Sequence, residues 1–157
     1  MSDQNMSGQT IPSTAQDLLA ETAQLLAAHD LEGAELKALE ALTQCEAAHG
    51  RRSLSVALCL SKLGHVYEQR AHFAKATRVH GEACVIRQGI LGKHADTALS
   101  LNDYGATLMA DGQWGQAMEG LNMALVMYKK LNMLESPEAH ACRKNMAACK
   151  EAAGCSG

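Results

Sequence analysis

The sequence repeats one of its own segments, and this repeat is the feature that most limits the fold. Leucine or tyrosine side chains are spaced around a glycine in Leu60–Tyr67, and the same spacing returns 41 residues later in Leu101–Leu108. The same shift places Phe73 on Trp114. Two segments that keep one register indicate an array of structural repeats. Such arrays bind partners along an extended surface, so we expect recognition rather than catalysis.

The composition favours an all-α fold. Alanine and leucine are abundant, and only two prolines occur, Pro12 and Pro137. Good helix formers with few breakers predict long helices. We expect seven of them, over about residues 13–29, 31–49, 53–70, 73–90, 95–111, 114–131 and 136–153, with Ser136 as a cap and Pro137 at the first helical position.

These helices form a predicted α-solenoid of three antiparallel pairs plus a C-terminal capping helix. The length of 157 residues suits one domain, which we place over residues 13–153. Its repeats cover about residues 14–49, 53–92 and 95–133, and the capping helix covers 136–153. Residues 1–12 are polar and aperiodic and are predicted to be disordered, and residues 154–157 form a tail.

The repeat positions have a packing rationale. Glycine at positions 64 and 105 lets two helix backbones approach closely, while larger side chains fill the space around them. Cys142 and Cys149 lie 41 residues after Leu101 and Leu108. This spacing predicts that the last helix continues the series and that both cysteines point inward, where a free cysteine behaves as a small hydrophobic residue.

Charge is distributed unevenly along the chain. The formal net charge is −3, yet the first fifty residues carry eight acidic residues against one base, Lys37, so they sum to −7 and the remainder to +4. Complementary ends of this kind suggest an alternative function, a homo-oligomeric scaffold in which copies join head to tail. The basic residues are scattered among only five aromatic residues, so we expect no nucleic-acid partner.

The N-terminus and the cysteines indicate the compartment. No basic segment followed by an apolar run opens the chain, and no stretch reaches the roughly 20 apolar residues that span a bilayer. The six cysteines contain no Cys-x-x-Cys pair. We therefore expect a cytoplasmic protein with reduced thiols and no membrane contact.

The repeat resembles a known family, the tetratricopeptide repeat (TPR), whose usual unit is about 34 residues with related glycine and alanine positions. The 41-to-42-residue period and the segment from Ile90 to Tyr104 are similar to the extended repeat of kinesin light chains. Ala95 stands where that repeat has proline, and Asp103 where a second asparagine is common. The resemblance implies a scaffold or adaptor for protein binding, without motor activity.

In that family, partner segments lie on a concave surface made by the first helix of each repeat. The resemblance implies that partner-binding residues lie on this face: Leu58, Ser61, His65, Glu68, Leu99, Asn102, Met109, His140 and Arg143. Asn102 is the most attractive of them, because a carboxamide both donates to and accepts from a peptide backbone. The alternative, that Asn102 caps a helix or faces water, stays open. A methionine surface at Met118, Met123 and Met127 is a further alternative to simple packing.

Signs of chemistry are weak in this sequence. No phosphate-binding loop, nucleophile elbow or paired-carboxylate motif occurs, so we expect no enzyme activity and no cofactor. Cys142, Cys149 and nearby His140 invite a metal site, but inward packing of the cysteines is the stronger interpretation. The seven histidines are spread over turns and several faces, His80 standing at a normally aromatic packing position. We expect no two histidines to form a ligand pair and no metal to bind.

Overall fold

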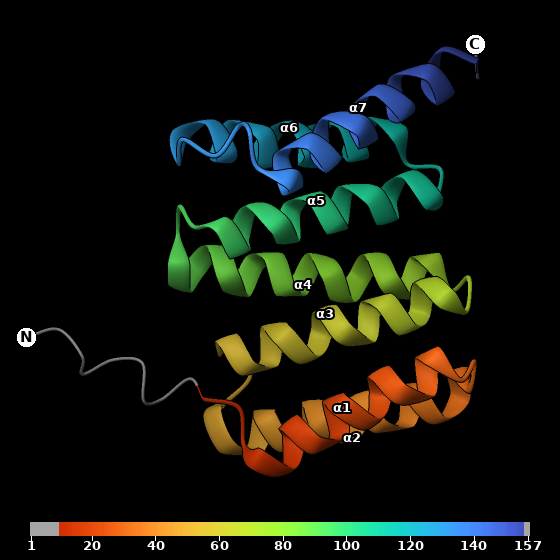
Figure 1. Ribbon diagram of the computed structural model, residues 1–157, viewed down its shortest axis with the longest axis vertical. Coiled ribbons are helices and arrows are strands. Elements are labelled where there is room, and N and C mark those ends of the chain that lie inside the picture. The colour runs from red at the N-terminus through yellow and green to blue at the C-terminus, as the bar shows by residue number, and fades with distance from the viewer. Residues whose placement is uncertain (1–9, 156–157) are drawn as a thin grey trace, which may run out of the picture. The chain divides into compact units, whose positions relative to one another are not determined.

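The computed structural model describes residues 10–155, and this part of the chain contains seven helices and no strand. The helices are α1 (Ser13–Ala27), α2 (Leu31–His49), α3 (Leu54–Gln69), α4 (Phe73–Leu91), α5 (Ala95–Ala110), α6 (Trp114–Lys130) and α7 (Pro137–Cys155) (Figure 1). Every predicted helix is present, with ends within two residues of the prediction, so the all-α class is confirmed. Helix α7 extends through Gly154, where a tail was predicted; residues 1–9 of the predicted disordered segment lie outside the described residues.

The chain divides into two compact units, and the division falls within α4, between Ile86 and Arg87. The first unit contains α1, α2, α3 and the N-terminal part of α4. The second contains the end of α4 together with α5, α6 and α7. Within each unit, consecutive helices run antiparallel and pack side by side (Figure 1). A single domain over residues 13–153 stays a prediction.

Helices α3, α5 and α7 each begin with a side-chain cap. The Ser53 hydroxyl accepts from the Val56 N–H at 3.3 Å, and the Ser136 hydroxyl accepts from the Ala139 N–H at 3.1 Å. The imidazole of His94 takes the same role before α5, accepting from the Asp96 N–H at 3.1 Å. Each cap satisfies an N–H that the helix itself leaves unpaired. The predicted Ser136 cap is confirmed.

The turns inside the three helix pairs also share one geometry. His29, Ala71 and Gly112 have positive φ angles of 60°, 56° and 75°. At each turn the N–H of the next residue donates to a carbonyl five residues earlier, with N–O distances of 2.9, 2.8 and 2.9 Å from Asp30, His72 and Gln113. This is the Schellman arrangement, in which a left-handed residue ends a helix. Each pair is therefore a copy of one helix–turn–helix unit.

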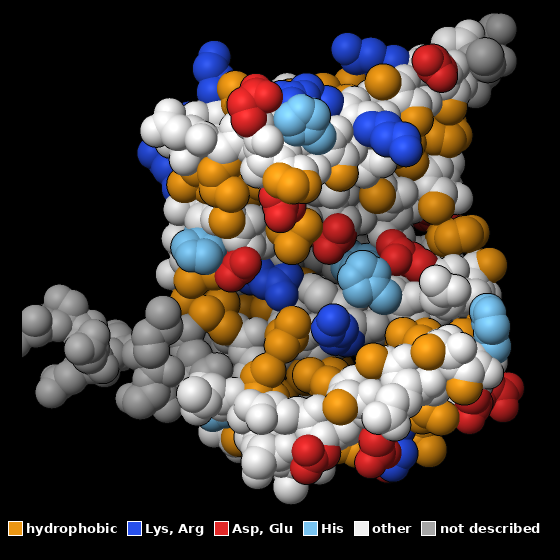
Figure 2. Space-filling view, in the orientation of Figure 1, with side chains coloured by type: hydrophobic (Ala, Val, Ile, Leu, Met, Phe, Trp, Pro, Cys, Tyr) orange, Lys and Arg blue, Asp and Glu red, His pale blue; other side chains and the backbone are white. Residues whose placement is uncertain are grey.

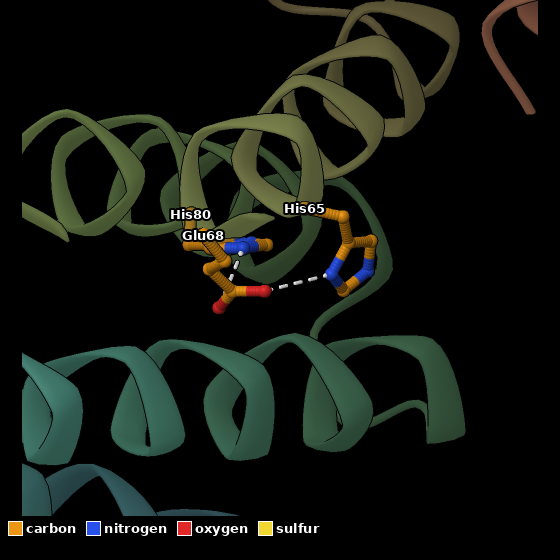
Figure 3. A group of neighbouring side chains, drawn as sticks. All are labelled: His65, Glu68 and His80. Carbon is orange, nitrogen blue, oxygen red and sulfur yellow. Dashed lines mark hydrogen bonds and ion pairs between the residues drawn. The ribbon is translucent and has the colours of Figure 1, made fainter. Parts of the chain in front are cut away.

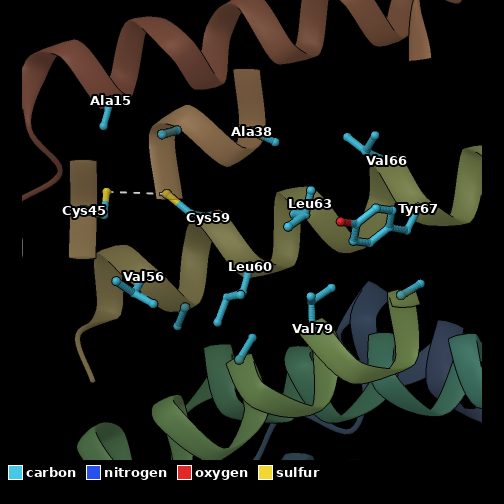
Figure 4. Packing of buried hydrophobic residues seen from close by; sticks show 14 of the residues in the cluster. Ala15, Ala38, Cys45, Val56, Cys59, Leu60, Leu63, Val66, Tyr67 and Val79 are labelled. Carbon is cyan, nitrogen blue, oxygen red and sulfur yellow. Dashed lines mark hydrogen bonds between the residues drawn. The ribbon is translucent and has the colours of Figure 1, made fainter. Parts of the chain in front are cut away.

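The core of the first unit joins small residues of α2 to large residues of α3 (Figure 4). Ala34, Ala38 and Ala41 are fully buried on α2, and Leu63 and Val66 on α3 are at most 2% exposed. Small side chains let the two helices approach, and the branched residues fill the remaining space.

The two glycines of the repeat mark close helix crossings. A Cβ atom added to Gly64 on α3 would clash with the ring of His80 on α4. A Cβ added to Gly105 on α5 would lie 2.7 Å from the Leu121 Cγ on α6. The second pair follows the first by 41 residues at both positions, so the same packing contact occurs once in each unit.

Helix α7 continues the buried pattern of α5, as predicted. Cys142 and Cys149 are fully buried, like Leu108. Their Sγ atoms donate to backbone carbonyls of α6, Cys142 to Leu121 at 3.3 Å and Cys149 to Trp114 at 3.4 Å. The inward packing of both cysteines is confirmed.

Replacing Gly105 with alanine is expected to lower the free energy of unfolding by about 1–3 kcal/mol, because the new methyl group overlaps the buried Leu121. Gly89→Ala is the matched control, since nothing lies within 4 Å of a Cβ there. That exposed helical site should gain up to about 1 kcal/mol from helix propensity. Urea unfolding measures both changes, and equal effects of the two substitutions would contradict the close crossing.

Candidate functional site

The predicted partner-binding residues lie on α3, α5 and α7, the first helices of the repeats, and their exposure depends on repeat position. Leu58, Leu99 and His140 are equivalent under the 41-residue shift. Leu58 is half-buried, Leu99 is 40% exposed, and His140 is exposed. This position is thus open on all three helices and presents two aliphatic side chains and one imidazole.

The next equivalent position differs from the expectation of an open surface. Ser61 and Asn102 are buried, at 8% and 7% exposure, and only Arg143 on the last helix is half-buried. Asn102 Oδ1 accepts a hydrogen bond of 3.2 Å from Asn145 Nδ2 on α7. The prediction that Asn102 caps a helix, faces water or lies open in a groove is therefore wrong, because the following first helix covers it.

The remaining predicted residues are His65, Glu68 and Met109, and all three are half-buried. The side chains of His65 and Glu68 are 45% and 29% exposed. Glu68 and Met109 occupy equivalent positions, one acidic and one apolar, so the two units present different chemistry at the same place on the repeat.

His65 and Glu68 also join His80 in a cluster between α3 and α4 (Figure 3). His65 Nδ1 lies 3.0 Å from Glu68 Oε2, and His80 Nε2 lies 3.4 Å from Glu68 Oε1. The two imidazole rings meet edge to face with centroids 5.1 Å apart. The sequence shows no evident histidine pair, but the structure brings His65 and His80 together at one carboxylate.

Helix geometry and the repeat together explain this cluster. His65 and Glu68 are three residues apart, so they share one face of α3. His80 reaches that face because it packs directly on Gly64, the residue before His65. The sequence alone does not reveal this contact, because the 41-residue register relates position 80 to position 121 and not to position 64, and side-chain directions are not explicit in a linear spacing.

A second surface feature lies on α6 in the second unit. Met123 and Val126 are 47% and 43% exposed. They line a shallow pocket of about 220 Å³ with Met127, Lys93 and Lys130, together with Asn122. An apolar floor between two lysines suits an acidic segment with apolar side chains. Of the predicted methionine surface, Met123 and Met127 belong to this pocket and Met118 does not line it.

The buried thiols are poor nucleophiles. Burial raises the pKa of Cys142 to about 11, although neighbouring Arg143 lowers it slightly. Burial also raises the pKa of Cys59, helped by a hydrogen bond to Cys45 with an Sγ–Sγ distance of 3.4 Å. Since the thiolate is the reactive and metal-binding form, these cysteines act as packing residues.

Charges of both signs are interspersed with hydrophobic side chains on the face drawn in Figure 2. Among residues 10–155, no helix has the length and apolar character needed to cross a membrane. A scan against protein-family models gives no match, and a search of curated proteins gives no significant match.

The burial of Asn102 leads to a test by double-mutant cycle. Asn102→Ala and Asn145→Ala should each cost about 1 kcal/mol of unfolding free energy, because each leaves the partner amide half-satisfied. The double variant should cost less than the sum, with a coupling energy of about 0.5–1 kcal/mol. Asn122→Ala, at an exposed position of α6, is the control and should change little. A neutral Asn102→Ala variant would contradict the buried hydrogen bond.

Proposed function

We propose that this protein is a non-catalytic adaptor that binds an extended or helical segment of another protein on the first helices of its repeats. The proposal takes the chain as a TPR-like α-solenoid of the extended, kinesin light chain-like type, with three antiparallel pairs and α7 as the cap. Three helix–turn–helix pairs that share one turn geometry support this interpretation.

The observation that carries the proposal is the open position shared by Leu58, Leu99 and His140. In a core, this position would be filled by buried side chains, yet large side chains remain at least partly exposed there on all three helices. Exposed aliphatic side chains at repeated intervals suit the apolar anchors of a bound segment. Polar and apolar contacts come from other residues of the same three helices, His65, Glu68, Met109 and Arg143.

The proposal also includes the cellular compartment of the protein and the ligands that it does without. It places the adaptor in the cytoplasm, where the buried thiols stay reduced, with no bound nucleic acid and no cofactor needed for partner binding. Specificity then depends on which residues occupy the open positions, because the turns and crossings are common to the repeats.

Selection from a library of displayed peptides tests the adaptor function directly. Peptides selected by the wild-type chain should bind Leu99→Asp and Leu58→Asp about tenfold more weakly, about 1.4 kcal/mol, because a carboxylate replaces an apolar anchor. Fluorescence anisotropy with one labelled peptide measures the affinity of each variant.

Val85→Asp is the matched control for these variants. Val85 is a 68% exposed aliphatic residue on α4, the second helix of its pair, so the same chemical change there should leave the affinity unchanged. Selected peptides that bind both leucine variants with wild-type affinity would place the binding surface elsewhere.

A second candidate function is head-to-tail self-assembly, and two surfaces favour it. On α2, Leu36 and Leu39 are 57% and 39% exposed, and they line a hollow with the acidic Glu32 and Glu35 and the basic Arg70 and Lys75. On α6, the exposed Met123 shares the pocket described above with Lys93 and Lys130. Both surfaces are partly apolar, and the complementarity between copies comes from the charge of −7 on residues 1–50 and of +4 on the remainder.

Light scattering after size exclusion tests this assembly. Association should be strong at about 0.01 M salt, where the Debye length is about 30 Å, and weak at about 1 M, where it is about 3 Å. Reversing both pocket charges, in Lys93→Glu with Lys130→Glu, should abolish it at low salt. Lys144→Glu, an exposed lysine on α7, is the control. A salt-insensitive oligomer would argue for apolar burial instead.

A further inference from the structure

We propose that His65, Glu68 and His80 form a binding site for a divalent transition-metal ion, with Zn²⁺ as the ion that the donor set fits best. The site lies within the first unit, between α3 and the start of α4 (Figure 3). It is independent of the adaptor function, since the argument depends only on these three side chains and their packing.

The geometry is close to that of a coordination sphere. One ligand atom from each residue lies within 4.8 Å of the other two. Zn²⁺ holds imidazole nitrogen and carboxylate oxygen at about 2.0–2.2 Å, so neighbouring ligands in a tetrahedral site are about 3.3 Å apart. His65 Nδ1 lies 3.0 Å from Glu68 Oε2, and His80 Nε2 lies 3.4 Å from Oε1 of the same carboxylate, so each imidazole nitrogen is near this separation from one carboxylate oxygen. The ligand atoms need to approach further to surround an ion, and the His65 side chain, at 45% exposure, has room to turn.

His80 provides an independent indication of a missing ligand. Its side chain is 1% exposed, and its Nε2 atom makes no hydrogen bond although it is buried. Leaving such a polar atom without a hydrogen bond is costly. The atom points into the cluster, toward Glu68, where a metal ion would bond to it.

The second unit shows that the repeat does not need this cluster. The 41-residue shift places His80 on Leu121, His65 on Ala106 and Glu68 on Met109. Leu121 fills the same place over Gly105 that His80 fills over Gly64. An apolar set therefore packs this crossing, and the two imidazoles and the carboxylate are a departure that packing does not explain.

The choice of metal follows from the donors. Two imidazoles and one carboxylate form the set that binds Zn²⁺ in sites with a fourth position open to water, and the same set is too rich in nitrogen for Ca²⁺ or Mg²⁺. Because the buried cysteines lie outside the cluster, no thiolate is expected among the ligands.

The test is a calorimetric titration of the full chain with Zn²⁺ alone, after metal removal and with a non-chelating reductant. One equivalent should bind, and Glu68→Gln, His65→Ala and His80→Leu should each weaken binding at least about tenfold, in line with the loss of a metal ligand. His80→Leu copies the residue of the second unit. Should it fail to fold by circular dichroism, the two partly exposed α3 variants still decide the result.

His94→Ser is the matched control. It removes an imidazole that lies 3.5 Å from the Asp96 carboxylate but keeps a residue suited to cap α5. Unchanged Zn²⁺ affinity in this variant supports the site. The proposal is overturned if the wild type binds no equivalent of Zn²⁺, or if Glu68→Gln and His65→Ala bind it as tightly as wild type. A thiolate charge-transfer band on titration with Co²⁺ would also overturn it, since the ligands would then include cysteine.

Discussion

The close approach of two helices at a glycine is the contact on which each unit depends. With no Cβ at Gly64 or Gly105, the facing helix comes near enough for one large side chain to seat directly on the backbone. That contact fixes which face of each helix is buried, because a helical face is set once one residue on it is placed. The buried rows on α3 and α5, and the cysteines on α7, then follow at regular spacing.

Because the glycine sets the helix crossing, the residue that packs on the glycine can be apolar or polar. Leucine at position 121 and histidine at position 80 occupy the same place, although one brings only apolar surface and the other a buried nitrogen. Functional differences in a repeat protein therefore lie in the departures from the repeat. His80, at the position that Leu121 fills in the second unit, is such a departure. The polar pair of His65 and Glu68, which faces His80 from α3, is another.

Sequence reasoning predicted what depends on local chemistry and on period. The helices, the Ser136 cap and the inward cysteines follow from helix propensity, from capping and from the 41-residue shift. The burial of Asn102 did not, because α7 covers it and tertiary contact between distant helices is not written in a period. The positive φ angles of His29 and Ala71 were also not predictable, because only the third equivalent turn has a glycine, Gly112. In the other two turns, the packed helix pair holds a non-glycine residue at positive φ.

The two proposals meet on α3, where His65 and Glu68 are among the proposed partner contacts and also belong to the cluster with His80. A metal ion held there would replace the direct contact between the two side chains with one positive centre. A segment bound over α3 would then meet different chemistry with and without the metal. If the segment prefers one of these states, the metal must in turn bind more tightly or more weakly when the segment is present, because coupling between two ligands is reciprocal. The second unit, with alanine and methionine at the equivalent positions, has no such dependence, so any metal effect on partner binding belongs to α3.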